Sequence, residues 1–403
     1  MPALARVLRY GCGLLISLCA ISCGGGNSLT GASTGPVTPA SNVVSVVVNA
    51  GPTTNSVNTL FTTVTVCLPG STTNCQTIDG IEVDTGSYGL RLMASVLTLS
   101  LPVSTASNGN SLVECTAFVD GFSWGPVALV DLKVSGESAS SVPVQLIGDS
   151  RFPNVPSDCS SVGPEEDTVA EFGANGIIGI GPIAQDCGST CVSTAVPATY
   201  YSCTQTTCEN TTVPLANQVP NPVSVFAKDN NGTIITLPNV AAGGAATVTG
   251  SLIFGIDTES NNVSGNETVL PVDPATADLT TIFDGQKLSS SFIDSGSNGF
   301  YFNDSSIASC TATGLTDFYC PASTESLSAT LEGASGTPSI TESFSVGDMA
   351  SFESTFTAFP DLAGTNPTPG SFDWGLPFFY GRRIANAIEG YTTSVGTGPY
   401  VAF

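Results

Sequence analysis

Short apolar runs separated by turn-forming residues dominate the chain from Val43 onwards. Runs such as Val43–Val48, Leu60–Leu68, Val113–Val119 and Val127–Val134 contain many β-branched residues and are bounded by Gly, Pro, Asn, Asp or Ser. Runs of this length and composition predict β-strands rather than helices. About 360 residues of this kind exceed what one β-sandwich core usually holds, so the pattern predicts an all-β protein with two lobes.

The first 22 residues follow a different pattern and predict a signal peptide. Arg6 and Arg9 form a basic segment, and the apolar run 11–20 that follows is too short to cross a bilayer. Ala20-Ile21-Ser22-Cys23 then resembles a bacterial lipobox, which implies cleavage before Cys23 and acylation of that cysteine. Plain secretion, with cleavage at a small-residue site, is the alternative.

Residues 23–42 combine the acylated cysteine with a flexible tether of Gly, Ser, Thr, Pro and Asn. If proteobacterial sorting applies, the absence of Asp after Cys23 points to the outer membrane. We therefore expect an exported protein that is anchored in the bacterial cell envelope through its N-terminal lipid.

Composition narrows the chemistry that the chain can perform. The sequence contains no His, which excludes Ser-His-Asp and Cys-His nucleophilic catalysis as well as His-ligated metal sites. Nine basic residues stand against 33 acidic ones, giving a net charge of −24. This charge argues against nucleic acid as a partner. Any hydrolysis must therefore depend on carboxylates, hydroxyls or Lys.

The cysteines indicate an oxidising compartment. Ten of the thirteen follow Cys23, an even number that suits disulfides. Their spacing suggests the bridges Cys67–Cys75, Cys310–Cys320 and, across a longer loop, Cys115–Cys159. The pairing within a tighter cluster stays open, and zinc binding there is an alternative to disulfides; the cluster consists of Cys187, Cys191, Cys203 and Cys208.

Two copies of one short motif carry the candidate chemistry. Val83-Asp84-Thr85-Gly86-Ser87-Tyr88-Gly89 is echoed by Ile293-Asp294-Ser295-Gly296-Ser297-Asn298-Gly299, each after an apolar strand-like run. A duplicated lobe would bring the two carboxylates face to face. Two carboxylates in contact cannot both ionise cheaply, so one would keep a proton and the other would not. Such a pair supplies both a general acid and a general base.

The paired motifs resemble the two active-site loops of the pepsin-like aspartic proteases. The resemblance implies an all-β, two-lobed fold with a cleft between the lobes that takes a peptide or protein substrate. Asp84 and Asp294 would share a proton and hold the attacking water. The resemblance implies a monomer that needs neither a metal nor another cofactor.

The same resemblance assigns supporting roles to the other loop residues. Thr85 and Ser295 would brace the two loops against each other. The glycines would bring backbone N–H groups to the carboxylates, and the serines would hydrogen-bond their outer oxygens. The glycines are Gly86 and Gly296, and the serines are Ser87 and Ser297.

Three further segments follow in the order that the family shows. Gly176–Gly181 resembles the apolar-Gly segment behind the first active-site loop, and Trp374–Gly381 resembles its partner in the second lobe. The lobe junction is similar to Asn221–Phe226 followed by Gly250–Asp257. We expect an N-terminal lobe over 43–259, with a Cys-rich insertion at 184–215, and a C-terminal lobe over 260–403.

Two departures concern the substrate-gripping parts. The candidate flap hairpin has Phe118 where the family carries a Tyr, with Gly121 at the turn and Trp124 as a residue that could close the cleft or merely pack. Arg91 stands where pepsins usually keep a Trp. Its charge could lower the pKa of the aspartate pair, or it could pair with a surface acid.

Two functions follow from these observations. The first is an aspartic endopeptidase of the cell envelope that activates water through Asp84 and Asp294. The second is a catalytically silent scaffold of the same fold that binds a protein or a polysaccharide-related partner. A purely structural envelope lipoprotein also fits the composition, but it gives no reason for two facing Asp loops.

Overall fold

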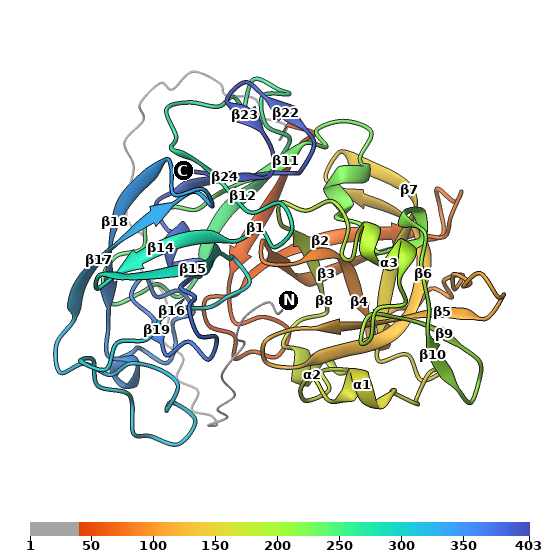
Figure 1. Cartoon of the computed structure of the whole chain (residues 1–403), viewed down its shortest axis with the longest axis horizontal. Helices are drawn as coiled ribbons and strands as arrows, with labels where there is room; N and C mark the ends of the chain where they lie inside the picture. The colour runs from red at the N-terminus through yellow and green to blue at the C-terminus, as the bar shows by residue number, and fades with distance from the viewer. Residues whose placement is uncertain (1–39) are drawn as a thin grey trace, which may run out of the picture.

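The computed structural model describes residues 40–403, whose regular secondary structure is mainly β-strand (Figure 1). The predicted signal peptide, Cys23 and most of the tether lie outside the described residues. Within residues 40–403, no helix has the length and apolarity needed to cross a membrane. The α-helices are single turns, namely α1 (Ser157–Ser160), α2 (Val169–Phe172) and α3 (Ser189–Ser193).

Strands from the start, middle and end of the chain form one antiparallel sheet that joins the two lobes. The red strand β1 lies beside green β12 and β11, and blue β24 lies on the same sheet (Figure 1). The order is β1 (Val43–Val48), β12 (Val248–Phe254), β11 (Gly232–Thr236), β21 (Arg383–Ala387), β24 (Tyr400–Ala402) and β13 (Val269–Pro271). We call it the shared sheet, because both lobes extend from it.

The N-terminal lobe consists of strands that continue from β1. They are β2 (Leu60–Cys67), β3 (Cys75–Asp84), β4 (Tyr88–Met93), β5 (Ser111–Ala117), β6 (Phe122–Val134), β7 (Glu137–Ile147), β8 (Gly176–Ile180), β9 (Tyr200–Cys203) and β10 (Cys208–Asn210). β6 also pairs with β2, which bends the sheet around a core of Val, Leu and Ile side chains.

The C-terminal lobe has its own sheet and a more aromatic core. Its strands are β14 (Leu279–Phe283), β15 (Gln286–Ile293), β16 (Phe300–Tyr301), β17 (Glu325–Glu332), β18 (Ser339–Val346), β19 (Ala363–Gly364) and β20 (Asp373–Trp374). Phe302 and Phe372 stack with their ring centroids 5.0 Å apart, and Phe344 meets Phe372 edge to face. Ring packing of this kind stabilises the strands that lead to the site.

Short elements complete the chain. They are the 3-10 turns η1 (Ala94–Val96), η2 (Leu215–Asn217), η3 (Pro222–Val225), η4 (Met349–Ser351) and η5 (Leu376–Phe379), and the hairpin strands β22 (Thr392–Thr393) and β23 (Gly396–Thr397).

The strands predicted from the apolar runs are confirmed with small shifts at their ends. β1 covers Val43–Val48 as expected, while the run 113–119 gives β5 over Ser111–Ala117 and the run 127–134 is the second half of β6. The all-β, two-lobed architecture expected for a pepsin-like protein is confirmed. The expected lobe boundary at 259/260 falls between β12 and β13, both in the shared sheet, and stays a prediction.

The three suggested disulfides are confirmed, and the tight cluster is resolved into two more. Cys67–Cys75, Cys115–Cys159 and Cys310–Cys320 form as expected. The cluster pairs as Cys187–Cys191 and Cys203–Cys208. Because a disulfide sulfur is not the thiolate that zinc requires, the zinc alternative for these four cysteines is wrong.

Candidate active site

Both Asp motifs begin where a strand of each lobe ends. β3 ends at Asp84. It pairs in parallel with β8, which places Asp84 opposite Gly179. β15 ends at Ile293, and the next residue, Asp294, donates its backbone N–H to the carbonyl of Trp374 at 3.0 Å. The apolar-Gly segments identified in the sequence therefore lie beside the two loops, as the resemblance implied.

The two loops are joined by four reciprocal hydrogen bonds. Thr85 Oγ1 donates to the carbonyl of Ile293 at 3.2 Å and accepts from Ser295 N at 2.9 Å. Ser295 Oγ donates to the carbonyl of Val83 at 2.7 Å and accepts from Thr85 N at 3.2 Å. Each hydroxyl thus satisfies two backbone groups of the opposite lobe. This brace fixes the two aspartates relative to each other.

Glycine permits the close approach of the two carboxylates. Gly86 N donates to Asp84 Oδ1 at 2.7 Å, and Gly296 N donates to Asp294 Oδ1 at 2.8 Å. A Cβ added at Gly86 would lie 2.7 Å from Asp294 Cγ, and one added at Gly296 would lie 2.7 Å from Asp84 Oδ1. Each carboxylate therefore packs directly on the opposite loop, where a larger residue would displace it.

The outer oxygens of the two aspartates differ in their partners. Ser297 Oγ donates to Asp294 Oδ2 at 2.8 Å. Ser87 Oγ is buried without a hydrogen-bond partner, so the hydrogen bond expected from Ser87 to Asp84 is not formed. The resemblance gave the two serines equal roles, but the serine hydroxyl of the first loop points towards Gly179 instead.

The environment of the site favours the protonated form of Asp294. Asp84 and Asp294 are only 2% and 1% exposed. Burial raises the pKa of Asp294 well above its usual range, and the nearby carboxylates of Asp84 and Asp373 raise it further. Asp294 therefore keeps its proton at a pH where an exposed aspartate is ionised.

A third buried carboxyl group, Asp373, lies beside this pair. It is 0% exposed, neither oxygen has a hydrogen bond of normal geometry, and its strand β20 pairs in parallel with β15 next to Asp294. Burial raises the pKa of Asp373 well above its usual range, the nearby Ser297 hydroxyl opposes that shift, and the charge of Asp84 adds to it. Sequence reasoning missed Asp373, although a single acid inside the apolar run 372–380 was a usable signal.

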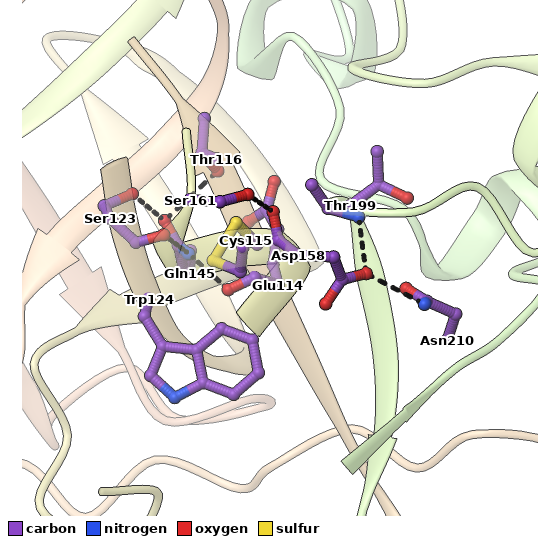
Figure 2. Close-up of a disulfide and its surroundings, with 12 residues drawn as sticks. Glu114, Cys115, Thr116, Ser123, Trp124, Gln145, Asp158, Ser161, Thr199 and Asn210 are labelled. Carbon is purple, nitrogen blue, oxygen red and sulfur yellow. Dashed lines mark hydrogen bonds between the residues drawn. A yellow bond between two sulfur atoms is a disulfide. The ribbon is translucent and has the colours of Figure 1, made fainter. Parts of the chain in front are cut away.

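The candidate flap is present as the β5–β6 hairpin, but two of its aromatic residues do not face a ligand. Phe118 is 8% exposed and meets Phe172 edge to face. Trp124 is 2% exposed, its Nε1 donates to the carbonyl of Phe152 at 2.8 Å, and its ring packs near the Cys115–Cys159 disulfide (Figure 2). The suggestion that Trp124 closes the cleft is therefore wrong.

The tip of the hairpin nevertheless reaches the second lobe. Val119 packs against the aromatic cluster that contains Tyr301 and Phe359. A Cβ at Gly121 would lie 2.5 Å from the carbonyl of Pro164, so Gly121 allows the chain segment around Pro164 to support the hairpin from behind.

Arg91 takes part in a buried ion pair within the N-terminal lobe. Its guanidinium donates to Glu114 Oε1 at 2.7 Å and to Thr116 Oγ1 at 2.9 Å, and it lies 3.7 Å from Asp186 Oδ2. Figure 2 shows the surrounding network, in which Gln145 donates to the carbonyl of Glu114. The acid that pairs with Arg91 is thus buried rather than on the surface. Two carboxylates already face this cation, so we assign it no part in lowering the pKa of the aspartate pair.

A cleft of about 840 Å³ opens between the lobes beside the aspartate pair. Thr85 and Gly86 of the first loop and Ile293 of the second line one end of it. Tyr88, the first residue of β4, also lines the cleft. Burial raises the pKa of the Tyr88 phenol above its usual range, and the carboxylates around it raise it further, so Tyr88 is neutral.

Comparison with known proteins gives a family and a set of structural neighbours. The family model described as Protein of unknown function (DUF3443) matches residues 38–403. No curated protein matches the sequence. Among solved structures, the aspartic proteinase from Irpex lacteus is similar over 89% of this chain and 96% of that chain, with 16% sequence identity and a TM-score of 0.49.

Proposed function

The chain belongs to the family described as Protein of unknown function (DUF3443), and from the geometry of its own site we propose that it is an aspartic endopeptidase. The observation that carries this proposal is the pair of buried carboxyl groups, each held by a Gly N–H and packed against the opposite loop, with the two loops braced across the lobes. A purely structural protein has no need to bury two acids face to face, because each loses its hydration there.

The raised pKa of Asp294 suggests the roles of the two aspartates. Asp294 holds a proton, so Asp84 is the carboxylate that takes a proton from the attacking water. Asp294 donates its proton to the oxygen of the scissile carbonyl as the water oxygen bonds to the carbon. When the tetrahedral intermediate collapses, Asp84 gives its proton to the leaving nitrogen and Asp294 regains one from the intermediate. The reaction requires no covalent enzyme intermediate.

The test compares the purified protein with Asp84→Asn and Asp294→Asn variants. Each is incubated with denatured casein between pH 3 and 7, and new peptides are counted by mass spectrometry. Because a positioned acid or base contributes roughly 100- to 10,000-fold, we expect each variant to lose at least about 100-fold in rate. Asp79→Asn is the matched control, since Asp79 is an exposed acid on the same strand β3.

Thermal melts establish that each variant is folded. Cleavage that survives in both Asn variants would show that a different site, or a contaminant, is responsible. A folded parent protein that cleaves nothing across the pH range would favour the second candidate.

That second candidate is a scaffold of the same fold that binds a partner without cleaving it. One specific observation favours it: Phe118 and Trp124 are packed inside the N-terminal lobe instead of facing the cleft. A transition-state mimic that contacts both aspartates separates the two functions. An active pair binds such a mimic far more tightly than it binds substrate, so a large rise in melting temperature favours the peptidase.

We also propose, from the sequence alone, that the protein is anchored to the bacterial outer membrane through acylated Cys23. Replacement of that cysteine by serine should release the protein from the membrane fraction and abolish metabolic labelling with palmitate. Labelling that persists in the Cys23→Ser variant would contradict this localisation.

A further inference from the structure

The described residues that line the cleft beside the aspartate pair include acidic side chains but no Lys or Arg. Asp186, Asp278 and Glu389 are among its lining residues, whereas none of its lining residues within 40–403 is Lys or Arg. The three acids come from distant parts of the chain and from both lobes. The fold has therefore gathered negative charge around a space of about 840 Å³, large enough for a long side chain and part of a peptide backbone.

Two of these three acids form no ion pair with any side chain of residues 40–403. Asp186 is engaged, because it accepts a hydrogen bond from Tyr200 and lies 3.7 Å from Arg91. Glu389 Oε1 accepts from Ala184 N at 3.0 Å, and neither Glu389 nor Asp278 forms an ion pair with any residue of the described chain. Within residues 40–403, no Lys or Arg side chain forms an ion pair with either acid.

A buried amide on the floor of the cleft provides an independent indication of a ligand. Asn386 lies on β21, lines the cleft and is 1% exposed, yet neither its Oδ1 nor its Nδ2 has a hydrogen-bond partner among residues 40–403. Its neighbours Ala385 and Ala387 pack into an apolar cluster on the opposite face of the strand, so alternation turns Asn386 towards the cleft. A buried donor or acceptor without a partner costs about 1–3 kcal/mol, which a ligand with both kinds of group would relieve.

The same side of the site has a strongly negative electrostatic environment. Tyr88 lies among Asp84, Asp278, Glu389 and Asp294, all of which disfavour ionisation of its phenol. A group that binds here is favoured if it brings positive charge, and an anionic group is opposed by the ionised carboxylates among these acids.

We propose that this cleft is the subsite for a cationic side chain, lysine or arginine, of the peptide whose backbone reaches Asp84 and Asp294. Asp278 and Glu389 receive the cation. Asn386 Oδ1 accepts a hydrogen bond from it, and Asn386 Nδ2 donates to a carbonyl of the same peptide. This specificity rests on the proposed peptidase function, but binding of the cationic side chain can be measured without cleavage.

The expected effect follows from the strength of hydrogen bonds to charged groups. Such bonds contribute enough for a preference of about 10- to 100-fold over an uncharged side chain of equal length. Norleucine is the matched comparison for lysine, because it retains the apolar stem and lacks the ammonium group.

The experiment measures equilibrium binding of fluorescent peptides to the full chain carrying Asp294→Asn, which removes cleavage. Each peptide contains lysine at one position and has a norleucine counterpart. We expect one position at which lysine binds at least tenfold more tightly at pH 6. The double substitution Asp278→Asn and Glu389→Gln should reduce this preference to less than about threefold. The control pair Asp284→Asn and Glu325→Gln, two exposed acids outside the cleft, should leave it unchanged.

A second measurement uses the unaltered cleft, so it does not depend on whether the double variant folds. The preference for lysine should fall between pH 6 and pH 3, because protonated carboxyl groups no longer attract the ammonium. Equal binding of lysine and norleucine peptides at every position, or a preference that survives in the double variant, would overturn the proposal.

The two proposals fail in distinguishable ways. Lysine-selective binding by a protein that never cleaves casein would retain the cationic subsite and refute the peptidase. Asp84-dependent cleavage at sites without any enrichment of lysine or arginine would retain the peptidase and refute the subsite.

Discussion

Replacing Thr85 by valine tests whether the hydroxyl brace between the two loops holds the lobes together. Valine has nearly the same shape as threonine, so the substitution creates no cavity. It removes the acceptor of Ser295 N and the donor to the Ile293 carbonyl, both in a region from which water is excluded. An unsatisfied buried N–H costs about 1–3 kcal/mol and the lost bond to the carbonyl about 1 kcal/mol, so we expect a loss of about 2–4 kcal/mol in the free energy of unfolding.

Thr233→Val is the matched control for this prediction. Thr233 is 0% exposed, and its Oγ1 has no hydrogen-bond partner. The same exchange of hydroxyl for methyl there removes a buried polar group that satisfies nothing. The free energy of unfolding of Thr233→Val should therefore remain unchanged or rise slightly.

Urea denaturation of the oxidised proteins, followed by tryptophan fluorescence, measures both variants. The chain has two tryptophans: Trp124 reports on the N-terminal lobe and Trp374, next to the second loop, reports on the C-terminal lobe. We expect a lower midpoint for Thr85→Val with both reporters and no decrease for Thr233→Val. Equal shifts for the two variants would refute the reasoning, because the brace would then contribute no more than any buried hydroxyl.

Two further predictions concern disulfides and pH. Replacing both cysteines of Cys115–Cys159 by serine should lower the free energy of unfolding by about 4 kcal/mol, because this bridge spans 44 residues. The same replacement at Cys187–Cys191, which spans 4 residues, should cost about 2 kcal/mol. A larger loss for the short bridge in urea denaturation would contradict this. Burial raises the pKa of Glu137 to about 7 from 4.5, so the folded state binds this proton more tightly than the unfolded state and stability is lost as pH rises through 7. Glu137→Gln should therefore reduce the fall in melting temperature between pH 5 and pH 8, and an undiminished fall would assign it to other groups.

Local features of the sequence were enough to predict much of this protein. Apolar runs bounded by turn residues predicted β1 and β2 because strand formation depends on neighbouring residues along the chain. Cys67–Cys75 and Cys310–Cys320 were predictable because short loops bring their ends together without knowledge of the fold. The repeated Asp-(Thr/Ser)-Gly-Ser motif indicated two loops with the same task.

The tertiary structure decided which buried groups meet. Ser87 and Ser297 occupy equal positions in the repeat, yet only Ser297 bonds its aspartate, because different segments pack against the two loops. Asp373 could be recognised as an acid in an apolar run, but its place beside Asp294 depends on how β20 pairs with β15.

The acidic cleft is the clearest case of a feature that the sequence alone did not reveal. Asp278 lies far along the sequence from Asn386 and Glu389, and nothing in the surrounding sequence indicates that the three side chains line one cleft. The sequence by itself determined the strands, the Asp loops and the short bridges, since these depend on interactions between near neighbours. Only the packing of two lobes on the shared sheet placed these acids and a buried amide around one space, because burial and charge depend on distance in the fold rather than along the chain.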